Sequence, residues 1–214
     1  MPRRAIALGF GILLLAGCTS QGSGQSLMLD SGQSIVLDSG QAAVSSEFRV
    51  PQQEIADSVG AVMAGLNQPP GEPPPGLATG ATERIVLNRL IQSYARGNGI
   101  AVTQTQVEQA LEQLAQDNGG QAALNDLALQ SGIPLAELED TVATNLLVTQ
   151  IGSALNAAGD AAAQVESARV ALSEYSAQID VAVAPRYGTW DDEQLAIVPG
   201  SDLTQPAVQG EASQ

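Results

Sequence analysis

Residues 85–155 read IVLNRLIQSYARGNGIAVTQTQVEQALEQLAQDNGGQAALNDLALQSGIPLAELEDTVATNLLVTQIGSAL, and this stretch decides the fold of the chain. Thr103 followed by Gln106 is a capping-box signal, and the apolar residues after it recur at helical spacing. Gly119-Gly120 ends that helix, and a short apolar helix runs on to about Gln130. The pattern predicts at least three helices that pack together.

The last helix of this stretch has an unusually wide apolar surface. It begins near Pro134, which suits a first turn, and negative charge favours a helix start where Glu137, Glu139 and Asp140 lie. Its apolar residues form two adjacent rows, which are Leu138, Val142 and Leu146, and Leu147, Ile151 and Leu155. Two rows make a broad stripe, so we expect neighbours to contact this helix on more than one side.

The composition excludes several classes of function. The 214 residues include 23 acidic residues against eight arginines, and the formal net charge of −15 argues against nucleic-acid binding and against adhesion to anionic lipid. There is no histidine, which excludes histidine-based catalysis and histidine-ligated metals, and one cysteine cannot form an internal disulfide or a zinc cluster. Aromatic residues, at 3%, are too few for a stacking platform. We therefore expect no cofactor, no metal and no enzyme activity.

The N-terminus has the pattern of a lipoprotein signal. Arg3 and Arg4 precede an apolar run from Ala5 to Leu15, which is too short to cross a bilayer alone. Leu15-Ala16-Gly17-Cys18 resembles a bacterial lipobox, which implies removal of residues 1–17 and a diacylglycerol group on the sulfur of Cys18. The alternative is an ordinary signal peptide with an incidental cysteine. We expect a protein anchored by lipid to the extracytoplasmic face of the cell membrane.

Both ends of the mature chain have a composition typical of unstructured segments. Residues 18–41 are a Ser/Gly/Gln-rich tether in which the eight residues from Gln25 recur, in similar form, from Gln33. A small β-prone docking element is one interpretation of this repeat, but a spacer is the favoured one. The polar, acidic residues 199–214 are expected to form a disordered tail.

Residues 42–198 between these ends are expected to form one domain. Alternation from Val44 to Val50 predicts a short strand, and Pro51 begins a helix that a proline cluster at 69–76 ends. An apolar seam from Val165 to Ile179 predicts another helix, and further strands are expected at 181–183 and 194–198. We expect the strand near 44–48 to pair with that at 181–183, because each would otherwise leave its backbone groups unpaired. The fold class is mainly α, with about six helices and a small β element from the two chain ends.

Several parts of this domain resemble the N-terminal domain of SurA-type periplasmic chaperones. The resemblance rests on Leu90-Ile91, Tyr94-Ala95, the turn Gly99-Ile-Ala-Val-Thr103, Ser131-Gly-Ile-Pro134, Leu146-Leu147 and Ile151, together with the strand and helix within 42–66. The segment Pro185-Arg-Tyr-Gly-Thr-Trp-Asp191 is similar to the C-terminal segment of secreted lipoproteins with this domain. The resemblance implies a helical chaperone core that holds unfolded or secreted envelope proteins.

The chain departs from this family where an enzymatic domain would be expected. Full-length members insert parvulin prolyl-isomerase domains between the helical core and the returning C-terminal segment, and such a domain needs roughly 90 residues. Here Leu155 and Val181 bracket a far shorter segment. No catalytic residue is therefore carried over, and isomerase activity is not expected.

The candidate residues for binding a client polypeptide are apolar and aromatic: Leu138, Leu147, Ile151, Tyr187 and Trp190. Trp190 and Tyr187 lie beside Arg186 and have two interpretations. They form an exposed peptide-binding patch, or they anchor the last strand on the helices, which is the favoured interpretation. Most of the stripe that includes Leu147 is also expected to be core. Two functions remain open: a tethered chaperone that holds unfolded polypeptides, and an envelope adaptor or structural lipoprotein with one fixed protein partner.

Overall fold

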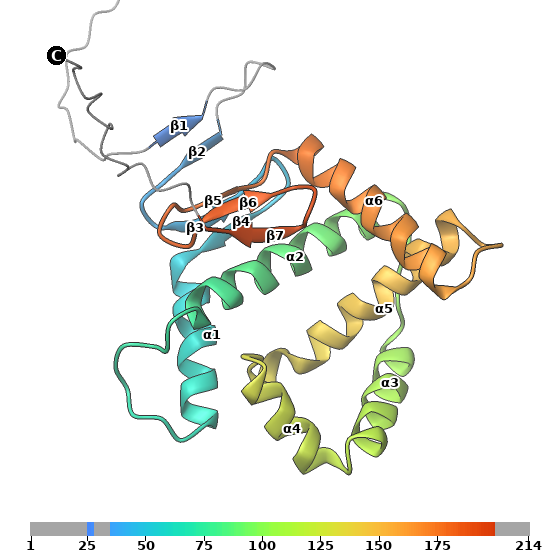
Figure 1. Cartoon of the computed structure of the whole chain (residues 1–214), viewed down its shortest axis with the longest axis horizontal. Helices are drawn as coiled ribbons and strands as arrows, with labels where there is room; N and C mark the ends of the chain where they lie inside the picture. The colour runs from blue at the N-terminus through green and yellow to red at the C-terminus, as the bar shows by residue number, and fades with distance from the viewer. Residues whose placement is uncertain (1–24, 28–34, 200–214) are drawn as a thin grey trace, which may run out of the picture.

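The structure, a computed structural model, describes residues 25–27 and 35–199. Its helices are α1 (Gln52–Gly65), α2 (Leu77–Gly97), α3 (Gln104–Asp117), α4 (Gln121–Gln130), α5 (Leu138–Leu155) and α6 (Ala161–Ile179), with a 3-10 turn, η1, at Leu135–Glu137. α2 runs through the middle of the domain, with α1 along one side and α5 and α6 against the other (Figure 1). The predicted mainly α fold with six helices is confirmed.

Local signals in the sequence set the ends of these helices. The hydroxyl of Thr103 accepts a hydrogen bond from the N–H of Gln106 (3.3 Å), whose side chain accepts one from the N–H of Thr103 (2.8 Å), so the predicted capping box is present. Gly119 and Gly120 separate α3 from α4, with φ angles of 87° and 110° that favour glycine. The N–H of Ala163 donates to the carboxylate of Asp160 (2.9 Å), which caps α6.

Strands from the two ends of the domain meet in one small sheet. β3 (Gln41–Val44) lies between β4 (Arg49–Pro51) and β5 (Ala182–Val183), and both pairings are antiparallel. Ala43 lies opposite Val183 and Val44 opposite Ala182, which confirms the expected pairing of the chain ends. A separate hairpin joins β6 (Thr189–Asp191), which the sequence did not reveal, to β7 (Ala196–Val198).

The single strand expected from Val44 to Val50 is wrong, because the chain reverses within it. The hydroxyl of Ser45 accepts hydrogen bonds from the N–H groups of Glu47 (3.1 Å) and Phe48 (3.0 Å). These bonds close a turn, so residues on either side of it become the neighbouring strands β3 and β4.

α5 is held on more than one side, as its double apolar stripe predicts. It packs against α2, α6 and α3. Leu147 and Ile151 belong to the main core cluster, with Val86 and Leu90 of α2 and Leu172 of α6. The helix backbones of α5 and α6 approach so closely at Gly152 that a Cβ there would lie 2.4 Å from the carbonyl oxygen of Gln164. The other buried apolar residues of this region lie outside the main cluster: Val107, Ala115, Leu124, Ala128, Leu129 and Val142.

The two copies of the N-terminal repeat each contribute a strand. This differs from the unstructured spacer that the sequence favours. β1 (Gln25–Leu27) pairs antiparallel with β2 (Ile35–Leu37), and Ser26 lies opposite Val36. Cys18, the leader and residues 200–214 lie outside the described residues. Within the described part of the chain, every helix is too short or too polar to span a membrane.

Candidate functional site

Three of the five candidate residues for binding a client are buried in the core. Ile151 is 0% exposed, Trp190 is 7% exposed and Leu147 is 8% exposed. These three side chains contact other parts of the domain and present almost no surface to a partner. Leu138 and Tyr187 are half-buried, so each keeps some surface that a ligand could contact.

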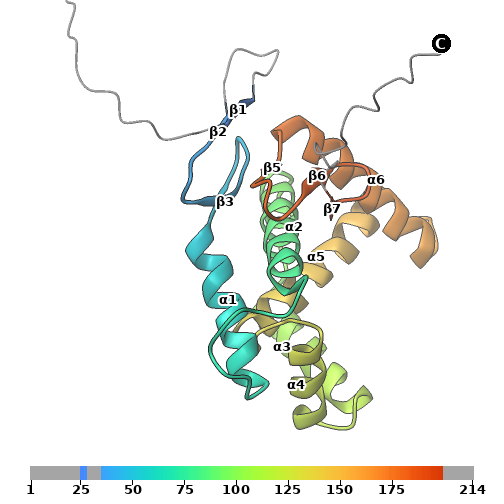
Figure 2. The ribbon, with the colours of Figure 1, turned by 60° about the vertical axis from the view of Figure 1, so that its left-hand side comes forward.

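Tyr187 lines a cavity of about 660 Å³, which we call the α1 cleft. One wall is a face of α1, and the opposite wall is the proline-rich segment that follows it, which loops beside α1 in both views (Figures 1 and 2). The apolar lining residues are Ile55, Ala56, Val59, Met63, Ala64, Pro70, Pro73 and Ala78. Gln52, Gln53 and Gln68 add uncharged polar groups, and Gly60 and Gly71 add bare backbone.

The electrostatic character of the α1 cleft is opposite to that of the whole chain. Among the described residues, no acidic side chain lines it, although the chain carries 23 acidic residues. Its charged group is Arg186, whose guanidinium carbon lies 5.0 Å from the centre of the Tyr187 ring, within range of a cation–π contact. An apolar lining with few polar groups is typical of a site for apolar ligands.

A second cavity of about 550 Å³ is lined in part by the end of the same proline-rich segment, and we call it the α2–α4 cleft. Its lining includes Leu66, directly after α1, Leu77 and Ala81 of α2, Leu129 of α4, and Ile133, which follows α4. Leu66 is among the exposed large apolar residues, so this cleft also offers apolar surface.

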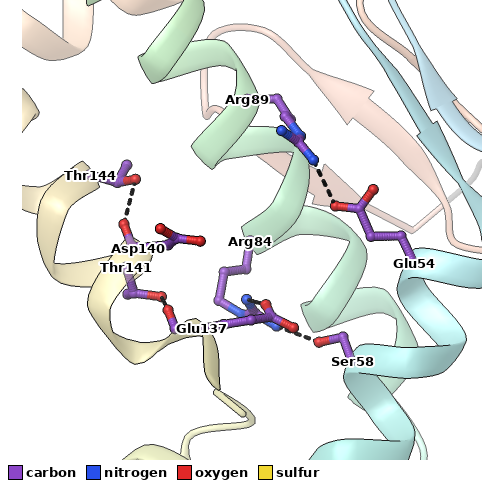
Figure 3. Close-up of polar contacts among 8 residues, drawn as sticks. All are labelled: Glu54, Ser58, Arg84, Arg89, Glu137, Asp140, Thr141 and Thr144. Atoms are coloured by element: carbon purple, nitrogen blue, oxygen red, sulfur yellow. Dashed lines mark hydrogen bonds and ion pairs between the residues drawn. The ribbon is translucent and has the colours of Figure 1, made fainter. Parts of the chain in front are cut away.

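Arg84, on the wall of the α2–α4 cleft, forms a polar clip between three elements (Figure 3). Its guanidinium donates to the Ser58 hydroxyl on α1 (2.8 Å) and pairs with the Glu137 carboxylate in η1. A second ion pair, between Arg89 and Glu54 (3.1 Å), joins α2 to α1 nearby. In both ion pairs the arginine on α2 bonds to a residue of the same domain. These contacts therefore link α2 to α1 and η1.

Acidic side chains of η1 and of the β6–β7 hairpin have partners within the domain. Glu137 pairs with Arg84, and the carboxylate of Asp192 accepts a hydrogen bond from the Ser176 hydroxyl. Asp191 accepts the N–H groups of Gln194 and Glu193 (2.9 Å each), and the bonds from Gln194, ahead of that from Glu193, hold the pKa of Asp191 below its ordinary value. Among the described residues, no three His, Cys, Asp or Glu side chains gather as a metal site would require.

Sequence reasoning identified Tyr187 and Arg186 but missed the surface that they complete. The α1 wall and the Arg186–Tyr187 wall come from opposite ends of the domain, so no local periodicity could reveal the cleft between them. The available signal was the proline cluster directly after α1, because prolines cannot extend the helix and keep the returning chain stiff.

Comparison with known proteins places most of the domain in one family. The SurA N-terminal domain family model matches residues 39–152, from the turn before β3 to near the end of α5. Chaperone SurA of Nitrosospira multiformis is 27% identical over 112 residues, which are 51% of this chain and 26% of that protein. This chain thus spans about a quarter of the length of that relative. No solved structure matches the chain. Arg186 and Tyr187 lie beyond the matched range.

Proposed function

Because this chain belongs to the SurA N-terminal domain family, we propose that it is a chaperone-like protein that holds unfolded or secreted polypeptides in the α1 cleft. We further propose that a lipid on Cys18 tethers it to the extracytoplasmic face of the cell membrane. It acts by binding alone, without prolyl-isomerase activity.

The observation that carries this proposal is the apolar lining of the α1 cleft in a strongly acidic chain. Unfolded polypeptides differ from folded ones chiefly in exposing apolar side chains, and a cleft whose lining is mostly apolar accepts such side chains with little burial of charge. The formal net charge of −15 keeps the remaining surface well hydrated. This suits a protein that binds polypeptides with exposed apolar side chains and must not aggregate with them.

The proposed lack of isomerase activity rests on what lies between α5 and β5. Where the family resemblance implies an inserted parvulin domain, the described chain has α6 and two short connections. α6 packs on α2 and α5, and it contributes Ala168 and Leu172 to the main core. This segment is therefore part of the holding domain itself.

Two exposed glycines allow a direct test of which cleft binds clients. Gly60 lines the α1 cleft and Gly80 lines the α2–α4 cleft, both within helices, and a Cβ at either position meets no atom within 4 Å. Gly60→Gln should fill the α1 cleft and raise helix stability by up to about 1 kcal/mol. Gly80→Gln and Gly97→Gln, the latter also with open space at its Cβ, are matched controls.

The measurement is suppression of aggregation for several unrelated unfolded proteins by the full chain. We expect Gly60→Gln to weaken suppression several-fold, while Gly80→Gln and Gly97→Gln leave it unchanged and all three variants melt at or above the wild-type temperature. Loss of suppression in Gly80→Gln alone would move the site to the α2–α4 cleft. Indifference of the wild type to every client would contradict the holding function and favour an envelope adaptor with one fixed partner.

A further inference from the structure

Arg186 differs from the arginines that stabilise the domain. Arg84, Arg89 and Arg169 form ion pairs with Glu137, Glu54 and Glu166, respectively. Arg186 is exposed and makes no ion pair or hydrogen bond with any residue that the structure describes. Tyr187 holds its guanidinium beside the α1 cleft, so its N–H donors remain available to a ligand.

A further cavity, of about 330 Å³, lies next to the α1 cleft, and we call it the β5 cleft. Its lining comprises Leu37, Asp38, Ser39, Gln41, Gln52 and the residues from Ala182 to Arg186. Arg186 and Gln52 line both cavities. The side-chain amide of Gln52 is fixed by donating to the carbonyl oxygens of Ser39 (2.6 Å) and Gln41 (3.3 Å). A chain that lies in the α1 cleft can therefore continue past Arg186 into the β5 cleft.

Gln41, which lines the β5 cleft, carries a buried side-chain atom without a partner among the described residues. The side-chain oxygen Oε1 of Gln41 is buried and accepts no hydrogen bond within the described part of the chain. A buried acceptor without a donor costs free energy, and native structures contain few of them. The one acid on this wall, Asp38, already accepts from the N–H of Ser39 (2.6 Å). The site thus offers a free cation and a free acceptor, which match a carboxylate and a backbone N–H.

We propose that the two clefts together bind one extended client segment whose apolar residues lie in the α1 cleft and whose internal Asp or Glu side chain binds Arg186. When the Gln41 side chain turns toward the segment, its Oε1, which is buried without a client, accepts a backbone N–H of that segment. This inference rests on the proposed function and names the class of segment that the site prefers. The carboxylate is a side chain and not a chain end, because Arg186 lines two neighbouring cavities and the segment occupies both. A single carboxylate fits best, since the net charge of −15 repels strongly acidic segments.

The test uses the full chain and two fluorescent peptides, each an apolar segment capped at both ends, with either Glu or Gln at its centre. We expect the Glu peptide to bind about tenfold more tightly at low ionic strength, a difference that salt reduces. Arg186→Gln should make the two affinities equal. Arg96→Gln removes the same charge from an exposed position that lines neither cleft, and should keep the preference.

A third peptide separates the two sources of a carboxylate. It has Gln at its centre and an uncapped C-terminus, and we expect it to bind like the capped Gln peptide. A gain equal to that of the Glu peptide would overturn the internal side chain as the ligand, and a preference that survives Arg186→Gln would overturn Arg186 as its partner. If the wild type binds the Glu and Gln peptides equally and Gly60→Gln binds neither, this inference is refuted and the holding function stands. No binding of any peptide would refute both.

The role of Gln41 is tested by Gln41→Met, which removes the orphan acceptor and keeps the backbone bonds of β3. We expect peptide affinity to fall about threefold while the melting temperature stays the same or rises. A purely structural role would raise stability without changing affinity, and that result would overturn the proposed backbone contact.

Discussion

The indole Nε1 of Trp190 on β6 donates a hydrogen bond to the hydroxyl of Ser176 on α6, at 2.8 Å. Ser176 is fully buried and in turn donates to the carboxylate of Asp192. This chain of bonds fastens the last hairpin of the domain to its last helix. Of the two interpretations that the sequence allowed for Trp190, the structural anchor is the one that this geometry supports.

Replacing Trp190 by Phe should therefore lower stability without touching client binding. The change keeps an aromatic ring but removes the N–H, and the lost buried hydrogen bond and volume should cost about 1–2 kcal/mol. Thermal melts and binding per folded molecule measure the two effects separately. Tyr187→Phe is the control, because its hydroxyl has no hydrogen-bond partner among the described residues and its loss should leave the melting temperature unchanged. An unchanged melting temperature for Trp190→Phe would contradict the anchor.

Leu147→Ser should destabilise the domain and leave its binding intact. Leu147 is 8% exposed and lies in the main core, so the substitution creates a cavity and buries a hydroxyl, at a cost of about 2–5 kcal/mol. Leu135→Ser is the matched control, because Leu135 is 44% exposed and its loss should cost less than about 1 kcal/mol. Weaker client capture by Leu147→Ser at an unchanged melting temperature would show that the α5 stripe binds clients after all.

Arg84→Met should cost more stability than Arg89→Met. Arg84 is 14% exposed, and its removal leaves the carboxylate of Glu137 and the buried hydroxyl of Ser58 without their partner, which should cost about 1–2 kcal/mol. Arg89 and Glu54 are 47% and 33% exposed, and a pair that solvent screens so well should contribute less than about 1 kcal/mol. Urea denaturation of both variants gives the comparison. Equal losses would mean that the clip around Arg84 holds the helices no better than a surface ion pair.

Asp191 should make the last hairpin sensitive to acid. Its folded-state pKa lies below the ordinary value of 3.8, because the Gln194 backbone and side chain and the Glu193 N–H stabilise the carboxylate. Its contribution to stability is therefore complete above about pH 4 and is lost as the pH falls through the lower folded-state pKa. Melting temperatures of the wild type and Asp191→Asn should differ at pH 7, and the difference should shrink as the pH falls below 3.8. A difference that persists at low pH would argue against this carboxylate as the cause.

Cys18→Ser should abolish lipid attachment. We propose the Cys18 sulfur as the acylation site because of the lipobox pattern, so the variant should lose lipid labelling and fractionate away from the membrane. Wild type processed in the same cells is the reference. Membrane retention of Cys18→Ser with no lipid label on either protein would reject the lipid anchor.

The fold was predictable wherever the sequence carries a local rule. The capping box at Thr103 and the glycine pair at 119–120 fix helix ends through neighbouring atoms alone. The pairing of β3 with β5 followed from the need to satisfy backbone groups. The turn at Ser45 was not predictable in this way, because alternating residues look alike in one strand and in two strands that fold back on each other.

The candidate site was less predictable than the fold, because it depends on distant parts of the chain. Aromatic character drew attention to Tyr187 and Trp190 alike, but the neighbours that bury Trp190 and leave Tyr187 on a cleft belong to α6 and α1. Gly60 belongs to no sequence motif. It lines the α1 cleft because the proline-rich segment folds back beside α1.

The pairing of Ala43 with Val183 also determines the order in which this protein completes its own folding. A ribosome releases the chain from its N-terminus, so the helices from α2 to α5 can form local contacts early, whereas β3 must wait for the last segment of the domain. Trp190 and Leu195, which belong to the main core, arrive later still. Until that segment has emerged, β3 presents an open strand edge, which β5 closes once the chain is complete.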